Sequence, residues 1–131
     1  MPEETRTPGV GVRYVIDDVP AAIAFYTGLL GFSLLFDASP AFAALSRDGV
    51  RLLLSGDGSS GKRPLPDGCK QEPGGWNRLH IQVADLESEV ERLRAAGVRF
   101  RTPEIVTGPG GAQVLLDDPS GNPIELFEPR R

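Results

Sequence analysis

The sequence has few of the residues that most often build metal sites and disulfides. It contains one histidine, His80, and one cysteine, Cys69, among 131 residues. A single histidine excludes a site in which one chain provides two or three histidine ligands. A single cysteine excludes an internal disulfide and is typical of a reducing compartment, so we expect a cytoplasmic location.

Long apolar runs and clusters of basic residues are also missing. No apolar stretch is long enough to cross a membrane, so the sequence predicts no membrane partner. The formal net charge is −4 and the arginines are scattered. Proteins that bind nucleic acid usually carry a basic patch, and we therefore expect no nucleic-acid partner.

An internal repeat is present instead. Each half has an alternating strand followed by a helix with an aspartate N-cap, and these caps, Asp18 and Asp85, are 67 positions apart. The last strands of the two halves also match, at residues 48–55 and 120–127. We expect strands at residues 10–17, 32–36, 42–45, 50–54, 77–84, 98–102, 112–116 and 124–127. Both halves therefore have the predicted order strand–helix–strand–strand–strand.

We interpret the chain as a single domain, residues 1–131, with an α+β fold. Module one covers about residues 10–55 and module two about residues 76–128. The segment 56–75, rich in glycine and proline, is a predicted linker or lid loop. One helix can cover only one face of a sheet. We therefore expect two tandem βαβββ modules that form a concave, partly closed mixed sheet with the helices outside.

Two motifs indicate a family. They are Ala-Phe-Tyr-Thr-Gly-Leu-Leu-Gly-Phe at 24–32 and Asp-Pro-Ser-Gly-Asn-Pro-Ile-Glu-Leu at 118–126. With them the sequence resembles the vicinal oxygen chelate (VOC) superfamily, which includes glyoxalases, bleomycin-resistance proteins and dioxygenases. The resemblance implies the fold described above and a homodimer. The resemblance does not predict a particular reaction, because the superfamily contains lyases, dioxygenases, epimerases, thiol transferases and proteins that only bind a drug.

The resemblance also implies four metal-ligand positions, in the first and last strands of each half. In this sequence they fall on Gly11, Leu53, Arg78 and Glu125. Glycine and leucine have no ligand atom and arginine repels a cation, so only Glu125 matches. We therefore predict no metal and no other cofactor. His80 lies two residues from Arg78 and could be recruited as a further ligand.

Strand alternation places a mixture of apolar and polar side chains on the sheet face that the helices leave open. Such a mixture is typical of small-molecule sites. Trp76, just after Gly74 and Gly75, would add a flat stacking surface. The predicted ligand-binding residues are Arg13, Leu53, Trp76, Arg78, His80, Gln82, Glu125 and Phe127.

Three functions are compatible with these residues. The first is the binding of a small, partly aromatic molecule in the cavity of the sheet, as the bleomycin-resistance branch implies. The second is a metal-free enzyme whose candidate catalytic residues, His80 and Glu125, act as general acid and base. The third is a metal-dependent glyoxalase-like or dioxygenase-like enzyme with sparse ligands. For Glu125 the simplest alternative is a structural ion pair with Arg78 or Arg13.

Overall fold

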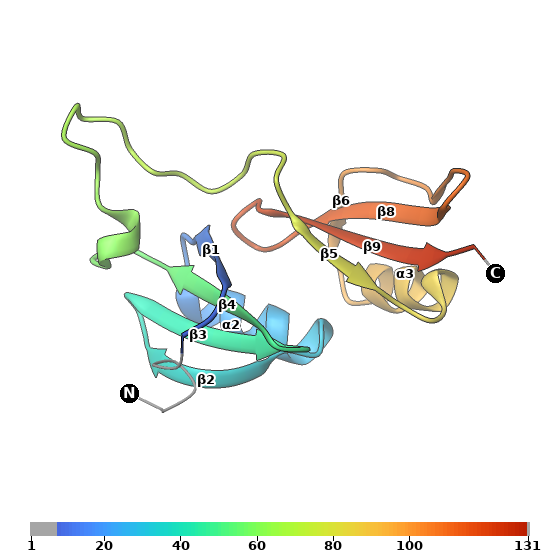
Figure 1. Ribbon diagram of the computed structural model, residues 1–131, viewed down its shortest axis with the longest axis horizontal. Coiled ribbons are helices and arrows are strands. Elements are labelled where there is room, and N and C mark those ends of the chain that lie inside the picture. The colour runs from blue at the N-terminus through green and yellow to red at the C-terminus, as the bar shows by residue number, and fades with distance from the viewer. Residues whose placement is uncertain (1–7, 131) are drawn as a thin grey trace. The chain divides into compact units, whose positions relative to one another are not determined.

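The computed structural model describes residues 8–130 of the protein. The chain divides into two compact units, of which the first ends at Gly74 and the second begins at Gly75. Each unit has a mixed sheet with a helix against one face (Figure 1). The boundary between the units falls at the end of the predicted loop 56–75.

The first unit contains a four-stranded sheet within its described residues, in the order β1-β4-β3-β2. Strand β1 (Gly11–Val15) pairs in parallel with β4 (Val50–Ser55). Strand β3 (Phe42–Arg47) lies between β4 and β2 (Ser33–Ala38) and is antiparallel to both. Helix α2 (Val19–Leu29) contacts β2, β3 and β4.

Local chemistry explains where α2 begins and which face it buries. The Asp18 side chain accepts a hydrogen bond from the Ala21 N–H at 3.1 Å, as an N-cap does. Tyr26 is fully buried, and its ring meets Phe25 and Phe32 edge to face at 5.1 and 5.4 Å. Val19, Ala22, Phe25 and Tyr26 are the buried residues of the helix and form the face that packs in the core of the first unit.

The second unit contains a five-stranded sheet within its described residues. Strand β9 (Pro123–Pro129) lies between β5 (Leu79–Gln82), to which it is parallel, and β8 (Gly111–Asp117), to which it is antiparallel. Strands β6 (Arg99–Phe100) and β7 (Val106–Thr107) both pair with β8. Helix α3 (Leu86–Ala95) buries Leu86, Val90 and Leu93 and contacts β8 and β9.

The α+β class and the two βαβββ modules are confirmed, and the two mixed sheets are not closed into a barrel. Two short elements were not predicted. Strand β7 lies in the expected connection 103–111, and a 3₁₀ turn, η1 (Ser60–Lys62), lies in the expected loop 56–75. The predicted strand 98–102 is only two residues long. Neither α2 nor α3 is long and apolar enough to cross a membrane.

A turn between β8 and β9 sets the start of the last strand. Asp118 and Asn122 are 4% and 2% exposed. One oxygen of Asp118, Oδ1, accepts hydrogen bonds from the Ser120 and Asn122 N–H groups at 2.9 Å each, and Oδ2 accepts from Asn122 Nδ2 at 3.1 Å. Gly121 has a φ of 90°, which glycine adopts without strain. The Asp118 carboxylate therefore holds the turn closed.

Replacing Asp118 by alanine should destabilise the protein. The substitution leaves buried N–H groups without an acceptor, and we expect a loss of about 2–3 kcal/mol in the free energy of unfolding. Urea denaturation followed by circular dichroism measures it. Glu91→Ala is the control, since Glu91 is exposed on α3. Equal stability of Asp118→Ala and the control would show that the carboxylate does not hold the turn.

Candidate functional site

The face of the second sheet opposite α3 is the most polar part of the predicted site. Along β5, Leu79 and Ile81 are buried while His80 and Gln82 are exposed. The register places His80 opposite Glu125 and Gln82 opposite Phe127 on β9. Strand alternation therefore brings four predicted site residues onto two neighbouring strands.

Glu125 is the centre of this group. Its side chain is 10% exposed, and its Oε1 accepts hydrogen bonds from Arg78 Nε and Nη2 at 3.0 and 2.9 Å. The other oxygen, Oε2, is 3.5 Å from Nε2 of His80, whose side chain is 51% exposed. A buried carboxylate needs such partners, because losing its hydration is costly. The ion pair with Arg78, one of the predicted alternatives for Glu125, is present.

Aromatic side chains border the polar group. The rings of His80 and Phe127 are 5.0 Å apart and tilted by 40°. Trp76 follows Gly74 and Gly75, which have φ values of 113° and 91°, and is 75% exposed. The Trp76 carbonyl accepts a hydrogen bond from Arg78 Nη1 at 3.2 Å. The second unit therefore combines a charged pair, an exposed imidazole and flat apolar surfaces.

Two predicted site residues, Arg13 and Leu53, belong to the first unit. They are register partners on β1 and β4, in the same relation as His80 and Glu125 in the second unit. Arg13 Nη1 donates a hydrogen bond of 2.6 Å to the hydroxyl of Ser55, which is fully buried. A Cβ atom at Gly61 would lie 2.0 Å from Arg13 Nη1. A larger residue at position 61 would therefore require the Arg13 guanidinium to shift from its present place.

Lys62 ties the same turn to the first sheet. Its Nζ donates to the Ile16 carbonyl at 3.0 Å and lies 2.8 Å from Asp57 Oδ1 and 3.5 Å from Asp17 Oδ1. The hydrogen bond with Asp57 raises the pKa of Lys62 above its ordinary value. The beginning of the predicted lid loop is thus anchored at η1.

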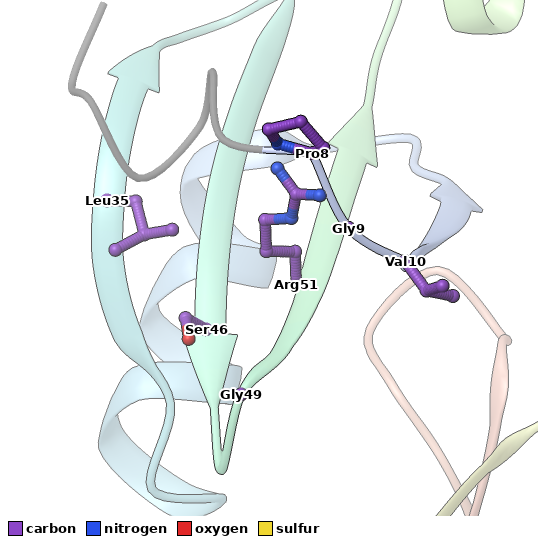
Figure 2. A pocket seen from close by; sticks show the side chains of 7 residues that line it. All are labelled: Pro8, Gly9, Val10, Leu35, Ser46, Gly49 and Arg51. Atoms are coloured by element: carbon purple, nitrogen blue, oxygen red, sulfur yellow. The ribbon is translucent and has the colours of Figure 1, made fainter.

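Two pockets lie away from the predicted site residues. The first, of about 280 Å³, is in the first unit; Figure 2 shows the side chains of Leu35, Ser46 and Arg51 at its wall, with α2 behind the sheet. The second, of about 320 Å³, lies beside the N-terminus of α3, where Glu128 Oε1 accepts a hydrogen bond from the Leu86 N–H at 2.8 Å. Sequence reasoning indicated neither pocket.

The four positions implied for a metal do not provide a metal site. Gly11 and Leu53 have no donor atom, and Arg78 already occupies one oxygen of Glu125 with two N–H groups. No group of three or more His, Cys, Asp or Glu within residues 8–130 is placed to hold a metal ion. The donor set at these four positions therefore does not fit a divalent metal.

Residues 11–126 match the model of the Glyoxalase/Bleomycin resistance protein/Dioxygenase superfamily. The chain belongs to this superfamily. Among curated proteins it is 28% identical over 117 residues to the proteins named Putative glyoxylase CFP32 of Mycobacterium bovis and Mycobacterium tuberculosis. The match covers 87% of this chain but 42% of those proteins, so the chain spans less than half of their length.

Solved structures agree with this assignment. The antibiotic-binding protein TnmS3 from Streptomyces sp. CB03234 is 26% identical, with a TM-score of 0.68 over 95% of this chain and 98% of that one. A superfamily member from Sphaerobacter thermophilus is 25% identical, with a TM-score of 0.72 over 94% and 98%. Lactoylglutathione lyase from Agrobacterium tumefaciens, 20% identical, shares the fold with a TM-score of 0.72 over 93% of both chains.

The contacts of Lys62 predict a stability difference that depends on pH. Its raised pKa means that the folded state holds the proton more tightly, so this stabilisation is present at neutral pH and is lost as the pH rises through the raised pKa. Lys62→Met should cost about 1 kcal/mol at pH 7, and the cost should shrink at strongly alkaline pH. Urea denaturation across pH measures this, with the exposed Lys70→Met as control. If Lys62→Met lost the same free energy of unfolding at every pH, the charge of Lys62 would not contribute to stability.

The ion pair of Arg78 and Glu125 predicts non-additive stability effects. Arg78→Met leaves the buried carboxylate without its two closest donors and should cost about 2–3 kcal/mol. Glu125→Gln keeps a neutral acceptor and should cost about 1–2 kcal/mol. The double variant should lose less than the sum of the two, because no unpaired charge remains. Chemical denaturation measures the cycle, with Glu91→Gln as control. Additive losses would show that the pair contributes no coupling energy.

Proposed function

We propose that this protein binds a small, planar organic molecule, without a catalytic metal, at the face of the second sheet opposite α3. The observation that carries the proposal is the unequal environment of Glu125. One carboxylate oxygen is held by Arg78, while the other faces His80, which is half-exposed. A purely structural ion pair has no need of an exposed imidazole. A ligand bound at this surface could donate a hydrogen bond to the fixed Glu125 carboxylate and accept one from His80.

The chemistry of the surface favours a planar ligand with polar substituents. The rings of His80 and Phe127 offer flat apolar contact, and Gln82, exposed next to them in register, offers an amide. Arg78 and Glu125 compensate each other in charge. The ligand therefore needs no large net charge, and its specificity would come from hydrogen bonds around an aromatic body.

Two further observations support binding without a metal. The donor set at the implied metal positions is too poor for a divalent ion, since Glu125 is the one residue among Gly11, Leu53, Arg78 and Glu125 with a ligand atom. TnmS3, at 26% identity over nearly the full length of both chains, is an antibiotic-binding protein. Sequestration of an organic molecule is consistent with both.

Acid–base catalysis is the second candidate, and one distance favours it. Nε2 of His80 is 3.5 Å from Glu125 Oε2, so the carboxylate is placed to orient the imidazole. A histidine oriented in this way can accept a proton from a bound substrate and return it. In this alternative the exposed side of the His80 ring faces the reacting atom.

Binding is tested with naphthalene probes. Isothermal titration calorimetry with 2-naphthol, 2-naphthoate and 2-naphthylmethylamine should show saturable binding of at least one probe, and cyclohexanol should bind more weakly because it cannot stack. His80→Ala and Phe127→Ala should each weaken binding about two- to tenfold. Glu91→Gln should bind as the wild type does. Absence of binding by all three naphthalenes, or equal binding by His80→Ala and the wild type, would contradict the proposal.

Catalysis is tested separately. Formation of lactoylglutathione from methylglyoxal and glutathione is measured with and without added Zn²⁺, for the wild type and His80→Ala. The binding proposal expects no turnover above the uncatalysed rate. Turnover that His80→Ala abolishes would favour the acid–base candidate, and turnover only with Zn²⁺ would favour a metal enzyme. The homodimer remains part of the proposal and is tested by light scattering.

A further inference from the structure

Arg101, which follows β6, joins three separate parts of the second unit. Its Nε donates to Asp117 Oδ1 at 2.6 Å, Nη1 donates to the Gly75 carbonyl at 2.9 Å and Nη2 donates to the Gly121 carbonyl at 3.0 Å. Its side chain is 23% exposed. A guanidinium has a planar set of donors in a fixed geometry, so three acceptors in different directions leave it little freedom.

The same guanidinium lies over Trp76. The central carbon of the Arg101 group is 5.4 Å from the centroid of the indole, within the range of a cation–π contact. Trp76 is nevertheless 75% exposed. Arg101 thus covers part of one side of the ring and leaves most of the indole surface open. An exposed indole held in this way keeps its apolar surface available at a small cost in side-chain entropy.

The backbone around Trp76 is fixed from both sides. The Gly75 carbonyl is bound by Arg101 and the Trp76 carbonyl by Arg78, at 2.9 and 3.2 Å. Arg78 in turn holds Glu125, and Glu125 lies next to His80. The Gly75–Trp76 backbone and the polar contacts on either side of it therefore connect Arg101 to the residues of the proposed binding surface. The two glycines before Trp76 have positive φ values, a conformation that glycine adopts without strain.

We propose that Arg101 is a positioning residue, which holds Trp76 as a fixed stacking surface for the planar ligand bound beside Arg78, His80 and Glu125. This inference rests on the proposed function for the ligand, but the immobilisation of Trp76 by Arg101 stands without it. No local motif indicated this role, since Arg101 lies 26 positions from Gly75 and 20 from Gly121.

The positioning is tested without ligand. Trp76 is the protein's only tryptophan, so tryptophan fluorescence reports on this residue alone. In Arg101→Gln the steady-state anisotropy should fall, and the acrylamide quenching constant should rise by up to about twofold because the covered part of the ring opens. Asp117→Ala, which removes the side-chain acceptor that anchors Arg101 Nε, should change both in the same direction. Arg99→Gln, at an exposed position on β6 two residues before Arg101, is the control. Wild-type anisotropy in a folded Arg101→Gln would overturn the inference.

The role in binding is tested by a double-mutant cycle on the tightest naphthalene probe. Arg101→Gln should weaken binding about two- to fivefold in the wild-type background, as loss of an exposed cation–π contact allows. In the Trp76→Leu background it should have no further effect, because the surface that it positions is gone. Equal weakening in both backgrounds would overturn the positioning role in binding. If no probe binds the wild type, the proposed function fails, while the anisotropy still decides whether Arg101 immobilises Trp76.

Discussion

Burial of one carboxylate in the central strand is the constraint on which the second unit depends. Glu125 lies between Ile124 and Leu126 on β9, and its register neighbours are His80 on β5 and Leu115 on β8. A charge in this position is stable only if neighbouring strands supply donors. Arg78 supplies two N–H groups to one oxygen. The need to compensate the buried charge of Glu125 therefore explains why Arg78 lies beside it and why this surface of the second unit is polar.

The first unit also buries a polar group that needs a hydrogen-bond partner, but this group is neutral. Ser55, at the end of β4, is the fully buried polar residue there, and Arg13 from β1 donates to its hydroxyl at 2.6 Å. In both units an arginine from the beginning of the unit therefore binds a buried acceptor on its last strand. A hydroxyl is neutral, so the Arg13 contact lacks the charge assistance of the Arg78 pair. Leu53 is in register with Arg13 as Glu125 is with His80, so the first unit has an apolar side chain where the second has a carboxylate.

The sequence predicted those parts of the fold that are encoded locally. The caps Asp18 and Asp85, the alternation along β5 and the isolated carboxylate of Glu125 each follow from a few neighbouring residues, and the structure has the expected helices, strand order and ion pair. Strand β7 was not predicted because two residues acquire a strand conformation only by pairing with β8. Such an element is determined by tertiary contact rather than by its own sequence.

Only part of the geometry around the candidate site follows from the sequence, for the same physical reason. Alternation identified the residues that share a sheet face, but it could not identify contacts made over long sequence separations. Lys62 binds the Ile16 carbonyl 46 positions away, and Arg101 binds the carbonyls of Gly75, just before Trp76, and of Gly121, in the turn that Asp118 holds. The pocket beside Arg51 forms where Gly9 leaves room, since a Cβ there would lie 2.8 Å from Arg51 Nη2. Such features depend on residues far apart in the sequence coming close together in the fold, and residue spacing does not predict this.

Arg78 occupies a position where the metal-dependent members of the superfamily are expected to have a metal ligand. Replacing a metal ligand by a guanidinium limits the chemistry that this surface can support. A divalent metal would accept lone pairs from several directions and polarise a bound oxygen as a Lewis acid. A guanidinium can only donate hydrogen bonds in one plane, and it keeps its charge at all physiological pH values. Three of those donors are already directed at Glu125 and the Trp76 carbonyl. Arg78 can therefore donate to an acceptor but cannot activate one as a metal would, and this supports the proposed absence of metal-dependent chemistry at this surface.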